Sequence, residues 1–249
     1  MALRITIFNE GYHERFNPIS KEVYPNGMHD ALAKAFDGED VEIRYACQYE
    51  ENCGLTEEIL DNTDVLIWWA HVLHNDLPDE IAQMVQRQVL KGMGLIALHS
   101  AHYSKPFRLL MGTSCSLRCH DVGERERLWV IEPGHPIVQG IPPYFELKHE
   151  EMYGERFDVP APDELILGGW FQSGEIFRSG CVWRRGYGKV FYFQPGHETY
   201  ATYREYPYIL KIIRNAAHYV ARPANLNANI DCIFAEELER VPDCDRIEY

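Results

Sequence analysis

The chain has 249 residues, of which 46% are apolar and 25% are charged, the composition of an ordinary soluble globular protein. Its net charge of −14, without any basic run, argues against a nucleic-acid partner. No apolar stretch reaches the ~18 residues of a membrane span, and the chain opens directly into a strand pattern without a signal peptide. We therefore expect a cytoplasmic protein that binds neither nucleic acid nor membranes.

The first 100 residues alternate between short apolar runs and helical patterns. Strands are expected at 3–8, 41–45, 65–69 and 92–98, and helices at 28–36, from Thr56, and at 78–91. Thr56 is the N-cap of the second helix, and the acidic residues after it suit the helix dipole. This β-α-β-α-β-α-β order is typical of a doubly wound, mostly parallel α/β sheet with helices on both faces, as in flavodoxin-like folds.

The pattern changes after residue 104. Short strand candidates at 128–131, 164–167 and 180–184 are separated there by turns rich in Pro and Gly. We expect an antiparallel extension in the middle of the chain that lies over the crevice of the sheet. A buried strand at 189–194 and a closing helix at 206–220 complete one α/β domain, residues 1–223. The acidic tail, residues 224–249, is expected to be a docked arm or a contact to a neighbouring subunit.

The apolar strand that ends at Leu98 runs directly into the sequence His99-Ser100-Ala101-His102. In open α/β sheets, the turn after a central strand lifts its first side chain into the crevice where ligands bind. Such an elbow more often presents a Ser or Cys nucleophile. Here it presents His99, which we predict to be a functional residue.

Histidines follow three of the expected parallel strands, at His71, His99 and His197, and His13 lies in the loop after the first strand. The carboxyl ends of parallel strands meet at one edge of a sheet. Because of this, residues that are distant in the sequence are expected to converge in one crevice. The strand-end histidines therefore predict a shared functional site.

Two acidic motifs accompany the histidines. The run His149-Glu150-Glu151-Met152-Tyr153 is either a solvated turn or a carboxylate and an imidazole placed opposite the histidines. In the second case these groups act as general acid or base, or complete the ligand set of a metal. In Gly196-His197-Glu198, the carboxylate of Glu198 can orient or charge the neighbouring ring, unless it serves only as an N-terminal helix charge.

A divalent metal is one expected cofactor, because three imidazoles and a carboxylate suit Zn, Ni, Mn or Fe. The predicted ligands are His71, His99, His149 and His197, with Zn the first candidate, and no nucleotide cofactor is evident. Seven cysteines is an odd number for a disulfide framework. Cys115, Cys119 and His120 form one close group but lack the second half of a zinc hairpin, so reduced thiols are expected.

The Gly-rich strand and elbow, together with the later Phe193-Gln194-Pro195-Gly196-His197-Glu198, resemble the class I glutamine amidotransferase-like fold. In that fold the elbow bears a catalytic cysteine and the late motif is His-Pro-Glu. Here His99 takes the place of the cysteine, no cysteine lies within ten residues of it, and no proline separates His197 from Glu198. The resemblance therefore does not extend to glutaminase chemistry.

Four short motifs resemble one particular branch of this fold. The Leu-His-Ser elbow, the Trp-Ala-His strand end, the Glu-Glu-Met-Tyr run and the Gly-His-Glu turn are similar to the ThuA-like (trehalose utilisation) branch of that fold, over about residues 3–222. This resemblance implies a role in carbohydrate catabolism, linked to oxidised (keto) disaccharides such as those derived from trehalose.

The first functional hypothesis is an enzyme acting on a sugar or keto-sugar, of the isomerase, lyase or hydrolase type. Its predicted catalytic residues are His99, His197, Glu198 and Glu151, and its predicted substrate-binding residues are His13, Trp69, Ser100 and Tyr153. The alternative is a non-catalytic sugar-binding or regulatory protein, in which Trp68, Trp69, Trp170 and Tyr153 stack on a sugar and the histidines only hydrogen-bond to it. The acidic tail and the aromatic content also suggest a homo-oligomer.

Overall fold

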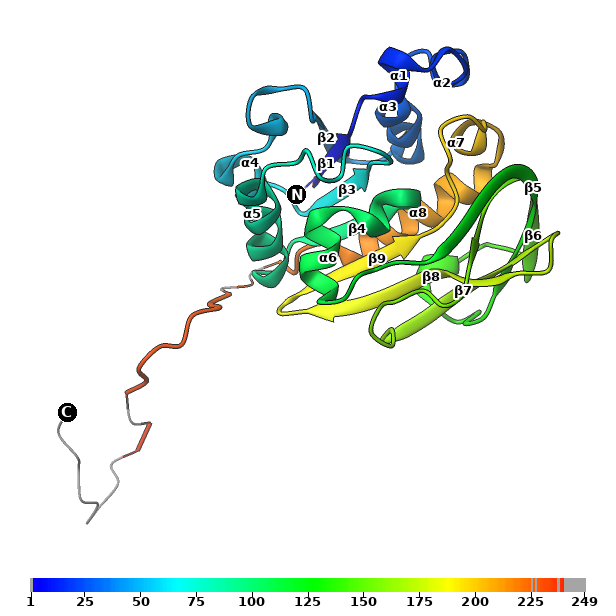
Figure 1. Ribbon diagram of the computed structural model, residues 1–249. Helices are drawn as coiled ribbons and strands as arrows, with labels where there is room; N and C mark the ends of the chain where they lie inside the picture. The colour runs from blue at the N-terminus through cyan, green and yellow to red at the C-terminus, as the bar shows by residue number, and fades with distance from the viewer. Residues whose placement is uncertain (1, 225, 227, 237, 240–249) are drawn as a thin grey trace.

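A computed structural model describes residues 2–224, 226, 228–236 and 238–239. Within these residues a single sheet of nine strands runs in the order β2-β1-β3-β4-β9-β8-β7-β5-β6 (Figure 1). The first five strands in this order are parallel: β2 (Val41–Cys47), β1 (Leu3–Asn9), β3 (Val65–Trp69), β4 (Gly94–Leu98) and β9 (Gly188–Phe193). The predicted doubly wound frame is confirmed.

Helices pack on both faces of the parallel strands. One face carries α5 (Asp79–Leu90) and α6 (Lys105–Met111), and the other carries α3 (Met28–Ala33) and α8 (Pro207–Val220). The strands are apolar on both faces because both are covered. Ile7 and Ile96 are completely buried, and each such side chain stabilises the fold by about 1.5–3 kcal/mol. At Gly94, a Cβ atom would lie 2.4 Å from the carbonyl oxygen of Val220, so only glycine fits between β4 and the end of α8.

The shorter helical segments refine the predicted elements. They are α1 (His13–Phe16), α2 (Pro18–Val23), α4 (Glu57–Asp61), α7 (Thr202–Glu205), and the 3₁₀ turns η1 (Lys34–Phe36), η2 (Glu51–Gly54), η3 (His99–Tyr103) and η4 (Pro136–Val138). Thr56 caps α4 as predicted, since its side chain accepts a hydrogen bond from the Ile59 amide. The segment after β1 is helical rather than the predicted loop, and His13 is the first residue of α1.

The middle of the chain continues the same sheet as antiparallel strands. These are β8 (Ile176–Arg185), β7 (Glu164–Phe171), β5 (Arg118–Val130) and β6 (Tyr144–Gly154), with β8 paired to β9. β5 is much longer than the strand predicted at 128–131, and β6 was not among the predicted strands. The far end of β6 returns to the carboxyl ends of the parallel strands, where the Gln194 side chain donates a 3.1 Å hydrogen bond to the Glu151 carbonyl.

The acidic run of residues 149–153 lies inside β6. Glu150 is fully buried and Glu151 is only 7% exposed, so the interpretation of this run as a solvated turn is wrong. A register shift between β5 and β6 adds an extra β6 residue between Leu147 and Glu150. Such a bulge interrupts the alternation of side chains between the two faces, and Lys148 and His149 are accordingly both exposed just before the buried Glu150 and Glu151.

The described part of the tail leaves the domain beside Gly92, next to α5, and runs away from it (Figure 1). Ile233, Phe234 and Leu238 in the tail are exposed. Among the described residues, no helix has the length and apolar character needed to cross a membrane.

Candidate functional site

The elbow after β4 has a left-handed backbone. His99 adopts φ = +53°, which is uncommon for a residue with a side chain, and its imidazole is fully buried. Such conformations are held in place by their surroundings and cluster at functional sites. The strand-to-helix turn therefore presents His99 in the way that related elbows present a nucleophile.

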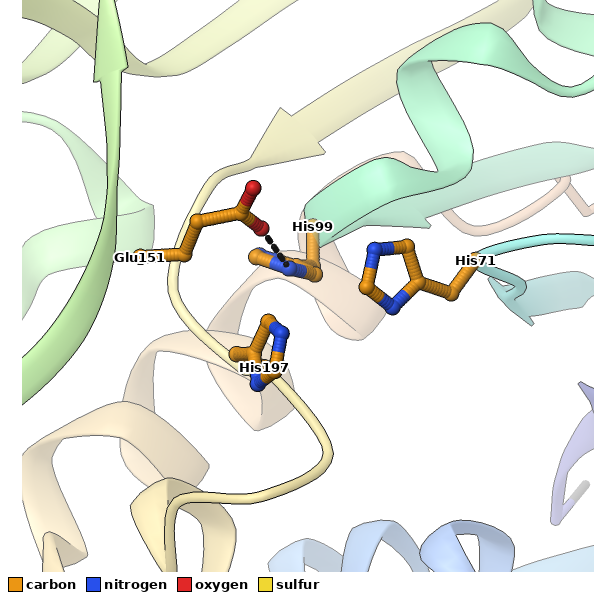
Figure 2. A group of neighbouring side chains, drawn as sticks. All are labelled: His71, His99, Glu151 and His197. Atoms are coloured by element: carbon orange, nitrogen blue, oxygen red, sulfur yellow. Dashed lines mark ion pairs between the residues drawn. The ribbon is translucent and has the colours of Figure 1, made fainter. Parts of the chain in front are cut away.

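Four side chains meet in front of this elbow (Figure 2). His71 follows β3, His99 follows β4, His197 follows β9, and Glu151 comes from β6. One possible ligand atom from each lies within 4.8 Å of those from the other three. The site thus joins three histidines from the parallel strands with one carboxylate from the antiparallel half.

His99 lies between two oxygen atoms. Its Nδ1 is 3.0 Å from the carbonyl oxygen of Gln194, and its Nε2 is 3.0 Å from Oε2 of Glu151. Burial alone would lower the pKa of His99, but the adjacent Glu151 carboxylate outweighs this effect and raises the pKa to about 9. Burial likewise works against the charged form of Glu151, and its contact with His99 lowers the pKa of Glu151 to about 2. A positive charge is therefore favoured between the two side chains.

His71 is oriented by Glu198. The Nδ1 atom of His71 lies 2.7 Å from Oε2 of Glu198, and the other oxygen of Glu198 lies 3.1 Å from Nδ1 of His13. Burial opposes ionisation of Glu198, but the hydrogen bond with His71 prevails and lowers the pKa of Glu198 to about 2. Nδ1 of His71 is held by this carboxylate, and its Nε2 is the nitrogen that faces the other three side chains.

His197 has the opposite tautomer. Its Nδ1 accepts a 3.2 Å hydrogen bond from the backbone amide of Thr199, and a backbone N–H can only donate. Burial and the charge of His99 lower the pKa of His197 to about 4, so the ring is neutral at pH 7. The proton of this neutral ring is consequently on Nε2. In this tautomer His197 can donate a hydrogen bond from Nε2, and its side chain also belongs to the group of possible metal ligands.

Two fully buried carboxylates hold the loops that carry the histidines. Glu10 accepts hydrogen bonds from the backbone amides of His71, Val72 and Leu73. Glu150 accepts them from the amides of Glu151, Gly196 and His197 and from the hydroxyl of Thr202. The sequence analysis gave Glu10 no role, and nothing local in its sequence indicates one. Glu150 was visible only as a member of the acidic run.

Other predicted site residues have different surroundings. His149 is exposed, and its Nδ1 hydrogen-bonds the Gly123 carbonyl, so the structure does not bring it into the group of predicted metal ligands. Trp69 is completely buried and donates to the Gly196 carbonyl. Ser100 and Tyr153 hydrogen-bond each other at 2.6 Å, and the Tyr153 ring stacks on His99. These three buried residues thus pack against the segments that carry His99 and His197.

The cysteine group of residues 115–120 does not assemble. Cys115 is buried, whereas Cys119 is exposed and His120 pairs with Glu124. Among the described residues these three side chains form no cluster of possible ligands. The two clusters found there are the four side chains around His99 and the adjacent trio of His13, His71 and Glu198.

The donor set around His99 fits a metal cation. Oε2 of Glu151 is buried, yet within the described chain it accepts no hydrogen bond. Nε2 of His13 is also buried and has no hydrogen-bond partner in the described chain, whereas its Nδ1 lies 3.1 Å from Glu198. Buried polar atoms without partners are rare, and a bound ion is one way to satisfy them. His71, His99 and Glu151 could hold such an ion through two nitrogen atoms and one oxygen atom.

Comparison with known proteins agrees with this architecture. The fold is that of class I glutamine amidotransferase-like proteins: a glutamine amidotransferase from Thermotoga maritima superposes with a TM-score of 0.53 at 11% identity, covering 88% of this chain and 97% of its own. The chain itself belongs to the ThuA, or trehalose utilisation, family, whose family model matches residues 4–220. The predicted resemblance is thereby confirmed, and membership of this family supports a carbohydrate-related role.

Two further solved structures share the fold. One is named as a ThuA-like protein from Parabacteroides merdae (TM-score 0.65, 14% identity, 89% of this chain and 92% of that one). The other is named as a cytoplasmic protein from Salmonella typhimurium (TM-score 0.58, 14% identity, 89% and 100%). None of the curated proteins matches the sequence significantly.

Proposed function

We propose that the protein is a cytoplasmic enzyme of carbohydrate catabolism that binds a divalent metal ion, with Zn the first candidate, through His71, His99 and Glu151. The observation that carries the proposal is the buried and unsatisfied Oε2 of Glu151, 3.0 Å from the Nε2 of His99. A proton or a metal cation would satisfy both atoms. Two imidazoles and one carboxylate are a donor set found in catalytic zinc sites.

The orientation of the two histidines supports the ligand role. Nδ1 of His71 faces Glu198 and Nδ1 of His99 faces the Gln194 carbonyl, so acceptors hold both rings and leave both Nε2 atoms for the ion. Histidine ligands in metal sites commonly have such partners, and loss of one lowers metal affinity about 10–100-fold. Glu198 is therefore assigned as an orienting group for His71 rather than as a base.

The substrate is proposed to be an oxidised sugar, such as a keto-disaccharide. A bound ion would polarise its carbonyl oxygen, which makes the adjacent C–H more acidic. His197 would donate from Nε2 to a sugar oxygen, because its Nδ1 accepts from the Thr199 amide. The low pKa of His197, caused by burial, keeps the ring neutral at pH 7, so its Nε2–H would polarise the substrate oxygen by hydrogen bonding.

Metal analysis tests the ligand set. Protein purified without chelators or affinity tags is expected to contain about one ion per chain, which His71→Ala, His99→Ala and Glu151→Ala should remove. His149→Ala is the matched control, since this exposed histidine lies outside the group. His197→Gln should keep the ion but lose turnover of a keto-disaccharide. Metal-free wild-type protein, or loss of the ion in the His149 variant, would overturn the assignment.

Measuring sugar binding and turnover together distinguishes the enzyme from the non-catalytic alternative. Its stacking side chains Trp68 and Trp69 are 2% and 0% exposed, which weighs against a sugar platform formed by them. If His197→Gln binds a keto-disaccharide as wild type does but no longer converts it, the enzyme is supported. If wild type binds the sugar without converting it, the protein is a binding module.

A further inference from the structure

The antiparallel half carries a hollow of about 790 Å³ that none of the four site side chains lines. It is formed by β5, β7 and β8, and its walls include Arg125, Arg127, Trp129, Ile131, Trp170 and Ile176. We call it the β5–β8 groove. Three of its apolar side chains are strongly exposed: Trp129 is 43% accessible, Ile131 48% and Ile176 64%. Exposed apolar side chains gathered around a hollow mark a surface that binds a partner.

Cations in the groove restrict the kind of partner. The guanidinium groups of Arg125 and Arg127 lie 5.7 and 6.0 Å from the centre of the Trp170 ring, and Arg127 also lies 5.6 Å from that of Trp129. Guanidinium groups over the indole rings leave less of their faces for a sugar to stack on. Nε of Arg125 is buried and has no hydrogen-bond partner in the described chain. Arg127 is paired with Glu146 at 2.6 Å, and Arg178 is paired with Glu155 at 2.8 Å. Arg125 lies 3.7 Å from Glu146 and is the most weakly paired cation of the three. The groove therefore suits a largely apolar segment that carries a carboxylate for Arg125.

The chain itself contains a segment of this kind. Residues 224–249 include seven Asp or Glu and only two Arg. Within the described part of this tail, Ile233 is 66% exposed, and Phe234 and Leu238 are fully exposed. The tail leaves the domain beside α5, while β5, β7 and β8 lie toward the other end of the sheet (Figure 1). Its course is away from the groove of its own chain.

We propose that the tail of one chain binds in the β5–β8 groove of a second copy. Phe234 and Leu238 would cover the exposed apolar side chains of the groove, and a neighbouring acidic residue would face Arg125. Reciprocal exchange of two tails gives a closed dimer with two identical contacts. This interaction is independent of the proposed metal chemistry.

The mass of the full-length protein in solution tests the proposal. At about 100 μM, which populates a micromolar dimer, wild type is expected to be dimeric by light scattering. The tail variant Phe234→Ser/Leu238→Ser and the groove variant Ile131→Glu/Ile176→Glu should each be mostly monomeric at this concentration, which requires a dimer affinity about 1,000-fold weaker. Phe16→Ser and Val122→Glu are controls, because these residues are also exposed but lie outside both surfaces.

Mixing the two monomeric variants tests whether dimerisation is caused by the tail of one chain binding the groove of another. The tail variant has an intact groove and the groove variant has an intact tail, so an equimolar mixture should contain a dimer held by one contact. Monomeric wild type, dissociation in only one of the two variants, or a mixture without dimer would overturn the proposal. Thermal melting of each variant checks that the exposed substitutions leave the fold intact.

Discussion

Glu10 and Glu150 allow the same substitution to be compared at two buried sites. Both are fully buried and both accept backbone N–H groups, but their donors are distributed differently. At Glu10, Oε2 alone accepts from residues 71, 72 and 73, and Oε1 receives only a second, longer contact of 3.2 Å from Val72. At Glu150, Oε1 accepts from Glu151 and His197, and Oε2 accepts from Gly196 and Thr202.

Glutamine replaces one of the two oxygens by an NH₂ group. In Glu10→Gln, the amide oxygen can take the place of Oε2 and keep all three amide donors. In Glu150→Gln, the better orientation of the amide points NH₂ at the Gly196 amide and at the Thr202 hydroxyl. The hydroxyl can rotate to accept from NH₂, but the Gly196 N–H loses its acceptor. A buried donor left without its acceptor costs about 1–3 kcal/mol. We therefore expect Glu150→Gln to lower the free energy of unfolding by at least about 1 kcal/mol more than Glu10→Gln does.

Urea unfolding at pH 7 measures this difference directly. Equal slopes with urea for both variants would show that the compared states are the same. In thermal melts, about 1 kcal/mol corresponds to roughly 2–4 °C for a chain of this size. The reasoning fails if Glu10→Gln is as destabilising as Glu150→Gln, because the distribution of donors between the two oxygens would then have no energetic consequence.

Three further predictions concern strain, pH and close packing. His99→Gly should be about 1 kcal/mol more stable than His99→Ala, since both remove the ring and only Ala retains the cost of φ = +53°; equal unfolding midpoints would refute strain at the elbow. Burial lowers the pKa of His102 from 6.5 to about 4, so the unfolded chain binds the extra proton first and stability falls as the pH drops from 6.5 to 4. His102→Gln should remove about 3 kcal/mol of that pH-dependent loss, and an unchanged pH profile of unfolding would contradict it. Gly94→Ala should destabilise the fold by at least 1–3 kcal/mol, roughly the cost of overpacking, because its Cβ would meet the Val220 carbonyl; a melting temperature equal to that of wild type would exclude this clash.

The parallel frame could be predicted from the sequence because its signals are local. Each strand is a short apolar run, and the direction of the chain follows from the helices between the runs. The antiparallel half was predicted less completely. β5 is largely polar from residue 118 to 127, and its pairing with β6 includes register shifts that no local pattern announces. The elements η3 and α6 after the elbow were likewise not expected.

The site residues, too, could be predicted from the sequence only in part. His71, His99 and His197 could be placed together because strand ends of a parallel sheet share one edge. Glu151 was proposed from composition, but its contact with His99 depends on the path of β6. His149 could not be separated from Glu151 by sequence, because the bulge that interrupts β6 alternation between Leu147 and Glu150 is a property of strand pairing. The support given by Glu10 depends on backbone amides 61 or more residues away.

The pairing of β4 with β9 also has a consequence for how the protein is synthesised. His99 follows β4 and His197 follows β9, the strand paired with it. All four antiparallel strands are synthesised between these two histidines. A ribosome must therefore release nearly the whole domain before the histidines and Glu151 can meet. Closing such a long excursion is entropically costly and slow. Newly made chains would pass through a period in which His99 has been synthesised but Glu151 and His197 are not yet beside it.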